Sequence, residues 1–300
     1  MAEQTLSSPV RASVAERPKG FASKRFQENA GRALATIVAI LGAVVVLFPM
    51  LWMLSTALKS QVGAMKMPPV WIPETLHWEN FYDALTFNPF GQYFINTLYY
   101  AIGVMIAETL VNSFISFGFA RVRAPGRNML FMFVLATLML PPQVTLIPQY
   151  YLFSKLNWLN TFLPMMVPAW FGSAYLIFMI RQFYMTIPKE YDEAAIMEGA
   201  SYFTIWRKIM LPLSTPVLGA VAIMSFMFHY NEYFRPIIYL NDNSKFTVQL
   251  GLSMFNSPFG GTPLHWLMAA SLAVTLPCII IFFFAQRFFI QGVVVSGVKG

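Results

Sequence analysis

The chain alternates between long apolar stretches and short polar segments. Six windows hold about 20 or more predominantly apolar residues with almost no charge, the length that an α-helix needs to cross a bilayer. These windows predict membrane spans near residues 33–58, 92–118, 129–153, 160–181, 211–234 and 264–287. Each span should be helical, because backbone polar groups in lipid must find their partners within the same segment. The predicted fold is an all-α integral membrane protein with residues 33–290 as a six-span domain.

The composition supports this class and excludes others. Hydrophobic residues make up 57% of the 300 residues and charged residues only 11%, whereas soluble domains carry about 25% charged residues. Such a chain is too apolar for intrinsic disorder and has too few charges to coat a soluble globule. The single cysteine, Cys278, excludes a disulfide framework and a cysteine-rich metal site.

The distribution of basic residues predicts the orientation in the membrane. Fifteen of the 20 Lys and Arg residues fall on the N-terminal tail, the C-terminal end and the loops after the second and fourth spans. Basic residues concentrate on the cytoplasmic side, so residues 1–32 and 291–300 should be cytoplasmic tails. The net charge of +7 is therefore a topology signal, and we expect no nucleic-acid partner. The first apolar stretch exceeds the h-region of a signal peptide, about 7–15 residues, and is interpreted as a retained span.

The predicted cytoplasmic loop 186–212 has the local signals of two short helices joined by a turn. Pro188 suits the first turn of a helix, and acidic residues follow it where the helix dipole favours negative charge. Gly199 can adopt the left-handed conformation that ends a helix. Ser201 can cap the next helix.

A spaced motif within this loop points to a known family. Glu-Ala-Ala is followed at fixed intervals by Gly, Ile and Leu-Pro, at Glu193, Ala194, Ala195, Gly199, Ile209, Leu211 and Pro212. This pattern resembles the EAA motif of ABC importer permeases. At ordinary residue frequencies, such a match arises by chance about once per hundred million starting positions.

Further segments resemble the carbohydrate-uptake branch of that family, most closely the second, maltose-type permease subunit. They lie at residues 138–143, 147–148, 188–191, 212–216, 231–236 and 286–292, so that the resemblance covers roughly residues 34–300. Two positions depart from that branch. Glu198 stands where Asp is frequent, and Tyr230 precedes Asn231 where Trp is usual.

The resemblance implies a role in an ATP-driven, binding-protein-dependent importer of the inner membrane, with a sugar or oligosaccharide as cargo. Polyol and glycerol-phosphate importers share these motifs. A second permease subunit, two ATP-binding subunits and an extracytoplasmic solute-binding protein would be the partners. The seven motif residues would form a coupling helix pair that docks on the ATPase and drives alternating access. The last residues, near Val295–Gly300, either reach into the ATPase dimer or end as a frayed tail.

The chain itself carries no sign of an enzyme. No phosphate-binding P-loop, dinucleotide fingerprint, HExxH motif or nucleophile elbow is present in the sequence. We expect this chain to bind no cofactor, with ATP and Mg²⁺ used by the partner ATPase. The three histidines, His77, His229 and His265, are far apart in sequence, and we expect no metal site.

An ion-coupled secondary carrier or channel is the alternative, and it would need buried ionisable groups along a relay. Glu108 is the only acid deep in a predicted span. It should face the bundle or hydrogen-bond to Asn112 or Thr109. Glu232 and Arg235 are spaced for a local ion pair. A membrane-embedded enzyme would need a paired acid and base, which the sequence does not offer.

Three polar residues in or beside the spans are candidates for the substrate pathway, namely Gln92, Gln143 and Asn231. The prolines at 141 and 142 should kink the third span, where a break either lines a cavity or serves packing. The outer segment Lys59–Gly91 is either a proline-ordered loop with interfacial aromatic residues or a contact for an extracytoplasmic partner.

Overall fold

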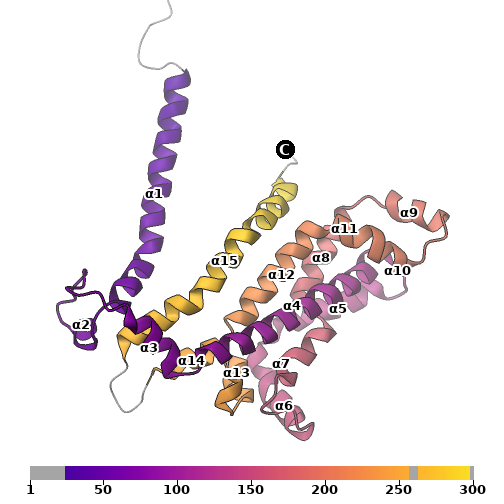
Figure 1. Cartoon of the computed structure of the whole chain (residues 1–300). Coiled ribbons are helices and arrows are strands. Elements are labelled where there is room, and N and C mark those ends of the chain that lie inside the picture. Colours follow the sequence, from indigo (N-terminus) through magenta and orange to yellow (C-terminus); the bar gives the residue numbers. More distant parts are fainter. Residues whose placement is uncertain (1–23, 257–262, 298–300) are drawn as a thin grey trace, which may run out of the picture. The chain divides into compact units, whose positions relative to one another are not determined.

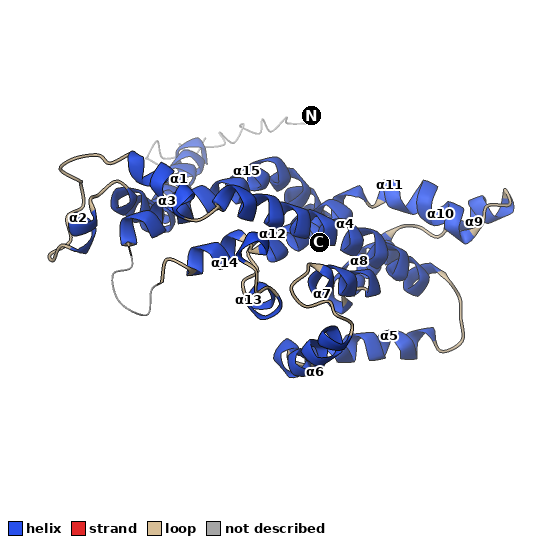
Figure 2. Ribbon diagram, turned by 60° about the horizontal axis from the view of Figure 1, so that its bottom comes forward, coloured by secondary structure: helices blue, strands red, loops and turns tan. Residues whose placement is uncertain are grey.

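The computed structural model describes residues 24–256 and 263–297. Within these residues the chain is helical and contains no β-strand (Figure 2), which confirms the all-α prediction. Its elements (Figure 1) are α1 (Lys24–Ala57), α2 (Gln61–Met65), α3 (Glu79–Phe87), α4 (Phe90–Arg121), α5 (Arg127–Ala136), η1 (Thr137–Met139), α6 (Pro142–Lys155), α7 (Leu163–Met166), η2 (Val167–Phe171), α8 (Ala174–Thr186), α9 (Glu190–Met197), α10 (Tyr202–Ile205), η3 (Trp206–Met210), α11 (Leu211–Leu213), α12 (Thr215–Tyr230), α13 (Phe234–Tyr239), η4 (Asn243–Lys245), α14 (Val248–Ser253) and α15 (Leu264–Gly297).

The chain divides into two compact units, Met1–Trp52 and Met53–Gly300. The described part of the first unit belongs to α1, which exposes apolar side chains along its length; Val45 is 72% exposed and Val46 76%. A helix that is apolar on all sides is typical of a lipid environment. Residues 1–23 of the predicted basic tail lie outside the described residues.

Several helices of the described chain are long and apolar enough to span a membrane. Four qualify singly, namely Asn29–Ala57, Phe90–Arg121, Leu163–Thr186 and Leu264–Phe284. Two bent pairs, Arg127–Met139 with Pro142–Lys155 and Tyr202–Leu213 with Thr215–Tyr230, raise the number to as many as six if each pair is one span.

The predicted third span, residues 129–153, is not a straight helix. Its two halves meet at an angle of 96°, where Pro141 precedes α6 and Pro142 opens it. Two consecutive prolines remove two backbone donors, and the pyrrolidine rings prevent the helix from continuing. The predicted fifth span, residues 211–234, also contains a break, since α11 ends at Leu213 and α12 begins at Thr215 after a bend of 82°.

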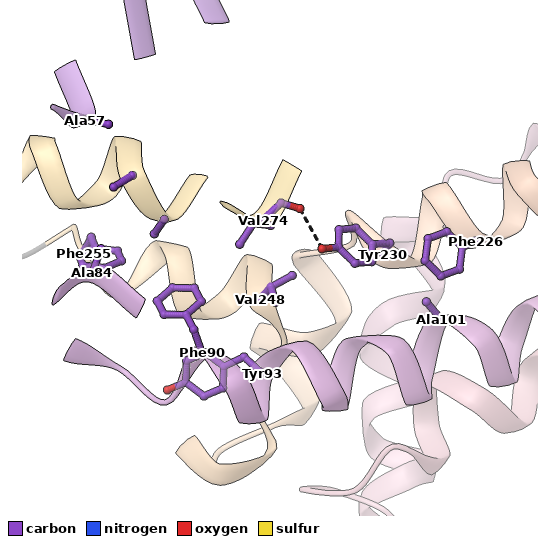
Figure 3. Close-up of a cluster of buried hydrophobic side chains, with 12 residues drawn as sticks. Ala57, Ala84, Phe90, Tyr93, Ala101, Phe226, Tyr230, Val248, Phe255 and Val274 are labelled. Carbon is purple, nitrogen blue, oxygen red and sulfur yellow. Dashed lines mark hydrogen bonds between the residues drawn. The ribbon is translucent and has the colours of Figure 1, made fainter. Parts of the chain in front are cut away.

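In the second unit, α4 is the central helix. It packs against α8 and α12, while α12 packs against α15 and α15 against α3. Figure 3 shows a buried apolar cluster in which the Tyr230 hydroxyl of α12 donates to the Val274 carbonyl of α15 at 2.9 Å. This bond gives a buried phenol its partner and joins the two helices.

The segment from η4 to α14 is fixed to the first turns of α4. Asn96 Nδ2 donates to the carbonyls of Ser244 and Phe246, both at 2.9 Å. Thr97 Oγ1 accepts from the Val248 amide at 2.9 Å. At Gly251 an added Cβ would lie 2.4 Å from the Tyr93 ring, so a glycine is required for this close approach.

The short helices α9 and α10 lie at the C-terminal ends of α4 and α8, away from α6, α7 and α13 (Figures 1 and 2). The loop predicted to couple with an ATPase therefore sits at one end of the second unit. Toward the C-terminus of the chain, the α15 backbone continues to Gly297, and residues 298–300 of the predicted tail lie outside the described residues.

Candidate functional site

The predicted coupling loop, residues 186–212, contains α9, and this helix stops just before Gly199, as predicted. Gly199 has φ +80°, the left-handed conformation expected of a residue that stops a helix. Ser201 caps the following helix, since its Oγ accepts from the Thr204 amide at 3.3 Å. Pro188 lies just before the N-cap Lys189 rather than inside the first turn of α9.

The second half of the loop is one continuous helical run with a π-helical turn in its middle. α10 leads into the π turn η3, which leads into α11. Within η3, Trp206 Nε1 donates to Ser113 Oγ at 3.0 Å. Ser113 Oγ also lies 2.7 Å from the Tyr184 hydroxyl. These bonds attach the loop to α4 and α8.

Helix α9 has two different faces. Asp192 and Ala195 are buried against the bundle, whereas Glu193 and Ala194 are exposed. Met197, at the end of the helix, is 87% exposed. The outer face is therefore open for contact with another protein, while the inner face is held by the chain itself.

Arg121 holds the inner face of α9 to the ends of two longer helices. Its Nε lies 3.2 Å from Asp192 Oδ2, and the two side chains are 4% and 13% exposed. Its Nη2 donates to the carbonyls of Tyr184 at 2.8 Å and Ile187 at 2.7 Å. One guanidinium thus joins the end of α4, the end of α8 and the start of α9. Burial raises the pKa of Asp192, and Glu193 adds to this, while the Arg121 charge lowers it.

The structure separates the seven motif residues by exposure. Glu193, Ala194, Gly199 and Pro212 are exposed, and Ile209 and Leu211 are half-buried. Ala195 is 8% exposed and packs into the core beneath the loop, so its small side chain allows close approach of α9 to this core. An added Cβ at Gly199 would meet no atom within 4 Å.

The three candidate pathway residues have separate surroundings. Gln92 Nε2 donates to Asn96 Oδ1 at 2.9 Å. Asn231 Nδ2 donates to the Met227 carbonyl at 2.8 Å, and its Oδ1 accepts from Gln249 at 3.1 Å. Gln143 is exposed in the first turn of α6. These contacts do not bring the three side chains together into one site.

A buried polar cluster that the sequence did not reveal joins α4 to α12 and the segment after it. We define the α4–α12 polar cluster as Tyr100, Glu108, Ser225, His229, Glu232 and Arg235. His229 lies at its centre with its side chain 3% exposed. A buried charged group is tolerated only where partners surround it.

Glu108 finds partners in this cluster that differ from those expected. Ser225 Oγ donates to Glu108 Oε2 at 2.6 Å, and His229 Nε2 lies 3.4 Å from the same oxygen. Asn112 bonds instead to the backbone carbonyl of Glu108 at 2.6 Å, and Thr109 Oγ1 has no partner. The expectation that Glu108 faces the bundle is confirmed.

The other end of the cluster carries the predicted local ion pair. Arg235 Nε lies 3.1 Å from Glu232 Oε1, which confirms that prediction. The Tyr100 hydroxyl lies 2.9 Å from His229 Nδ1 and donates to Glu232 Oε2. In the part of the chain that the structure describes, no group of three or more His, Cys, Asp or Glu side chains is arranged to hold a metal ion.

Comparison with known proteins identifies the family. Residues 112–295 match the family described as the binding-protein-dependent transport system inner membrane component. The chain belongs to this family. The match includes the whole predicted coupling loop together with α8 and α12, which precede and follow it in the sequence.

Relatives of this chain match over most of its length. It is 32% identical to the arabinooligosaccharides transport system permease protein AraQ of Halalkalibacterium halodurans, over 89% of this chain and 96% of that one. It is 30% identical to the trehalose/maltose transport system permease protein MalG of Thermococcus litoralis, over 91% and 99%. It is also 30% identical to the sn-glycerol-3-phosphate transport system permease protein UgpE of Yersinia enterocolitica, over 87% and 95%.

A solved structure shares the fold. A chain of a bacterial ABC transporter that imports the acidic polysaccharide alginate superimposes with a TM-score of 0.74 at 21% identity, covering 90% of this chain and all of that one. The chain is therefore a permease subunit of a binding-protein-dependent ABC importer, a component of the inner membrane rather than an enzyme.

Proposed function

We propose that this permease imports a sugar or an oligosaccharide and that its coupling loop docks on a separate ATP-hydrolysing subunit. Relatives named for arabinooligosaccharides and for trehalose and maltose support the carbohydrate class. The relative named for sn-glycerol-3-phosphate extends the class to phosphorylated polyols. ATP and Mg²⁺ would be used by the partner, and this chain would bind no cofactor.

The two-faced helix α9 carries the docking proposal. Its Glu193 and Ala194 are exposed and accessible to a partner, although Glu193 also lines the hollow beside the loop, while Asp192 and Ala195 are buried against the bundle. Glu193 can accept a charge-assisted hydrogen bond from a donor in the partner's socket. A push on α9 would reach α4 and α8 directly through Arg121, because the guanidinium contacts all three elements.

The proposed assembly contains a second permease, two ATP-binding subunits and an extracytoplasmic solute-binding protein. Closure of the ATP-binding subunits would move the coupling loop and rock the spans attached to it, which gives alternating access to a central pathway. Both termini would face the cytoplasm, as the distribution of Lys and Arg predicts. The exposed Gln143 and Asn231, and Gln92 at the start of α4, are the proposed pathway residues.

A charge reversal on the outer face of α9 tests the docking. We expect Glu193→Lys to lower uptake at least tenfold and to reduce co-purification of the ATP-binding subunit. Glu190→Lys is the matched control, since it reverses an exposed charge on the same helix outside the motif. Gly199→Pro should also abolish uptake, because Pro cannot adopt φ +80°. Normal uptake by Glu193→Lys and Gly199→Pro, at normal abundance in the membrane, would falsify the docking role.

The cargo is tested separately through the solute-binding protein. Titration of that protein with arabino-oligosaccharides, trehalose, maltose and sn-glycerol-3-phosphate identifies the solute, and uptake of that solute by the assembled importer checks the result. A binding protein specific for amino acids or metal ions would contradict the carbohydrate class while leaving the docking proposal intact.

A further inference from the structure

A cationic cavity lies beside the coupling loop. It has a volume of about 650 Å³ and lies between the ends of α4 and α8 and the helices α9 and α10. Its charged lining residues are Arg121, Arg123, Arg127, Arg181, Lys189, Asp192 and Glu193. Five cations therefore face two carboxylates in one hollow.

Most of these cations have no anionic partner. Arg121 is neutralised by Asp192. In residues 24–256 and 263–297, none of the other four cations forms an ion pair with a carboxylate. Arg127 donates to the Val122 carbonyl at 3.0 Å, and Arg181 Nε donates to the Phe119 carbonyl at 3.2 Å. These bonds position the guanidinium groups but leave their charge uncompensated, and Glu193 alone cannot balance it.

The cavity lies at the boundary between the spans and the polar loop. Arg181 stands within the candidate span Leu163–Thr186, and its guanidinium carbon lies 4.1 Å from the centroid of the Phe131 ring. Phe117, Ala120 and Met185 add an apolar wall. Unpaired charge next to hydrocarbon is costly, so this arrangement favours a ligand that brings both an anion and an apolar body.

We propose that this cavity binds the phosphate of an anionic phospholipid from the leaflet on the side of the coupling loop. Guanidinium groups bind phosphate oxygens in a bidentate geometry, and basic pockets between membrane helices bind anionic headgroups. The acyl chains would follow the apolar wall toward the spans. A soluble anion would use only the cations, and an acidic side chain of a docked protein would not use the apolar wall.

Native mass spectrometry of the purified, delipidated importer complex tests this site. Phosphatidylglycerol should bind at least tenfold more tightly than phosphatidylcholine. The double variant R123Q/K189Q should weaken phosphatidylglycerol binding about tenfold or more, as should R127Q/R181Q. R207Q/K208Q is the matched control, because it removes two exposed cations from the same loop that do not line the cavity. R123Q/K189Q decides the test if R127Q/R181Q fails to fold, since Arg181 also packs on Phe131.

Other outcomes would overturn the proposal. Equal binding of the two lipids, or equal losses in R123Q/K189Q and R207Q/K208Q, would show that the cavity selects no headgroup. Binding of inorganic phosphate as tightly as the lipid, measured by calorimetry in detergent, would assign the site to soluble anions. Failure of the complex to bind either lipid, with cross-links from position 127 to the ATP-binding subunit, would assign the cavity to a protein partner.

Discussion

His229 Nε2 lies 3.4 Å from Glu108 Oε2, although the two residues are on different helices. Glu232 flanks the other ring nitrogen of His229, also at 3.4 Å, and Arg235 pairs with Glu232. The α4–α12 polar cluster thus links α4 to α12 and to the segment after it through polar contacts.

Breaking this cluster at one end should destabilise the protein strongly. Glu108→Ala leaves His229 and Ser225 without their acceptor, and removing one partner of a buried ion pair costs about 3–5 kcal/mol. Glu108→Gln should cost less, since its amide oxygen can still accept from Ser225. Thr109→Val is the control, because the Thr109 hydroxyl is buried without a partner. The unfolding midpoint of each variant is measured by heating the protein in detergent and monitoring the folded fraction by size-exclusion chromatography. Equal midpoints for Glu108→Ala and Thr109→Val would contradict a stabilising role.

The Arg121 contacts predict an order of effects at the coupling loop. Arg121→Met should impair coupling of ATP hydrolysis to uptake more than Asp192→Asn does, because Arg121 also binds the Tyr184 and Ile187 carbonyls. Arg121→Lys should not restore the wild-type behaviour, because an ammonium group lacks the planar fork of donors. The ratio of ATP hydrolysed to solute imported gives the readout. Full coupling in Arg121→Met would show that the contact does not transmit the motion.

Acidification should stabilise the wild type relative to Asp192→Asn. Burial raises the pKa of Asp192 in the folded protein, so the folded state binds a proton at a higher pH than the unfolded state, whose pKa is about 3.9. The stability associated with this carboxyl is therefore lowest above the raised pKa and grows as the pH falls through it. Thermal midpoints of both proteins, compared between neutral pH and about pH 4, report this effect; a constant difference between them would contradict it.

Substitution by alanine should destabilise the protein more at Gly251 than at Gly103. Gly251→Ala places a methyl group 2.4 Å from the Tyr93 ring, and Tyr93 is fully buried, so we expect a loss of about 1–3 kcal/mol from overpacking. Gly103→Ala meets the terminal methyl of Met166 at 2.4 Å, and this flexible side chain can move away. The unfolding midpoints of the two variants should therefore separate, with Gly103→Ala the closer to wild type.

The conformation of Gly199 predicts which substitutions the loop accepts. A β-branched residue is strained at φ +80°, whereas Asn tolerates left-handed backbone. Because no atom lies within 4 Å of the Cβ position, size alone should not matter. We expect Gly199→Asn to retain uptake and Gly199→Val to lose most of it; the reverse order would contradict a conformational requirement.

Local and spaced signals made the fold and family predictable from the sequence. The long uncharged windows marked the helices, and the spacing from Glu193 to Pro212 marked the family. The turn at Gly199 and the cap at Ser201 depend on short-range chemistry, so the structure agrees with them. The sharpness of the bend at Pro141 and Pro142 was not predictable, since a proline pair indicates a break but fixes no angle.

Contacts between positions far apart in the sequence could not be predicted. Glu108 and Ser225 are 117 positions apart, and periodicity does not say which helix faces meet. For the same reason Arg121 counted only as a basic residue near the membrane, although its guanidinium organises the inner face of the coupling loop. The cationic cavity likewise combines residues from five helices and the loops between them.

The elbow between η1 and α6 constrains what can surround it in the working transporter. The 14 residues of α6 extend about 21 Å, less than the roughly 30 Å of a hydrocarbon core. A helix end leaves carbonyl groups without intrahelical donors, and lipid tails offer none. Wherever this elbow lies within the hydrocarbon core, a companion chain or water must supply the donors for any carbonyl left open there.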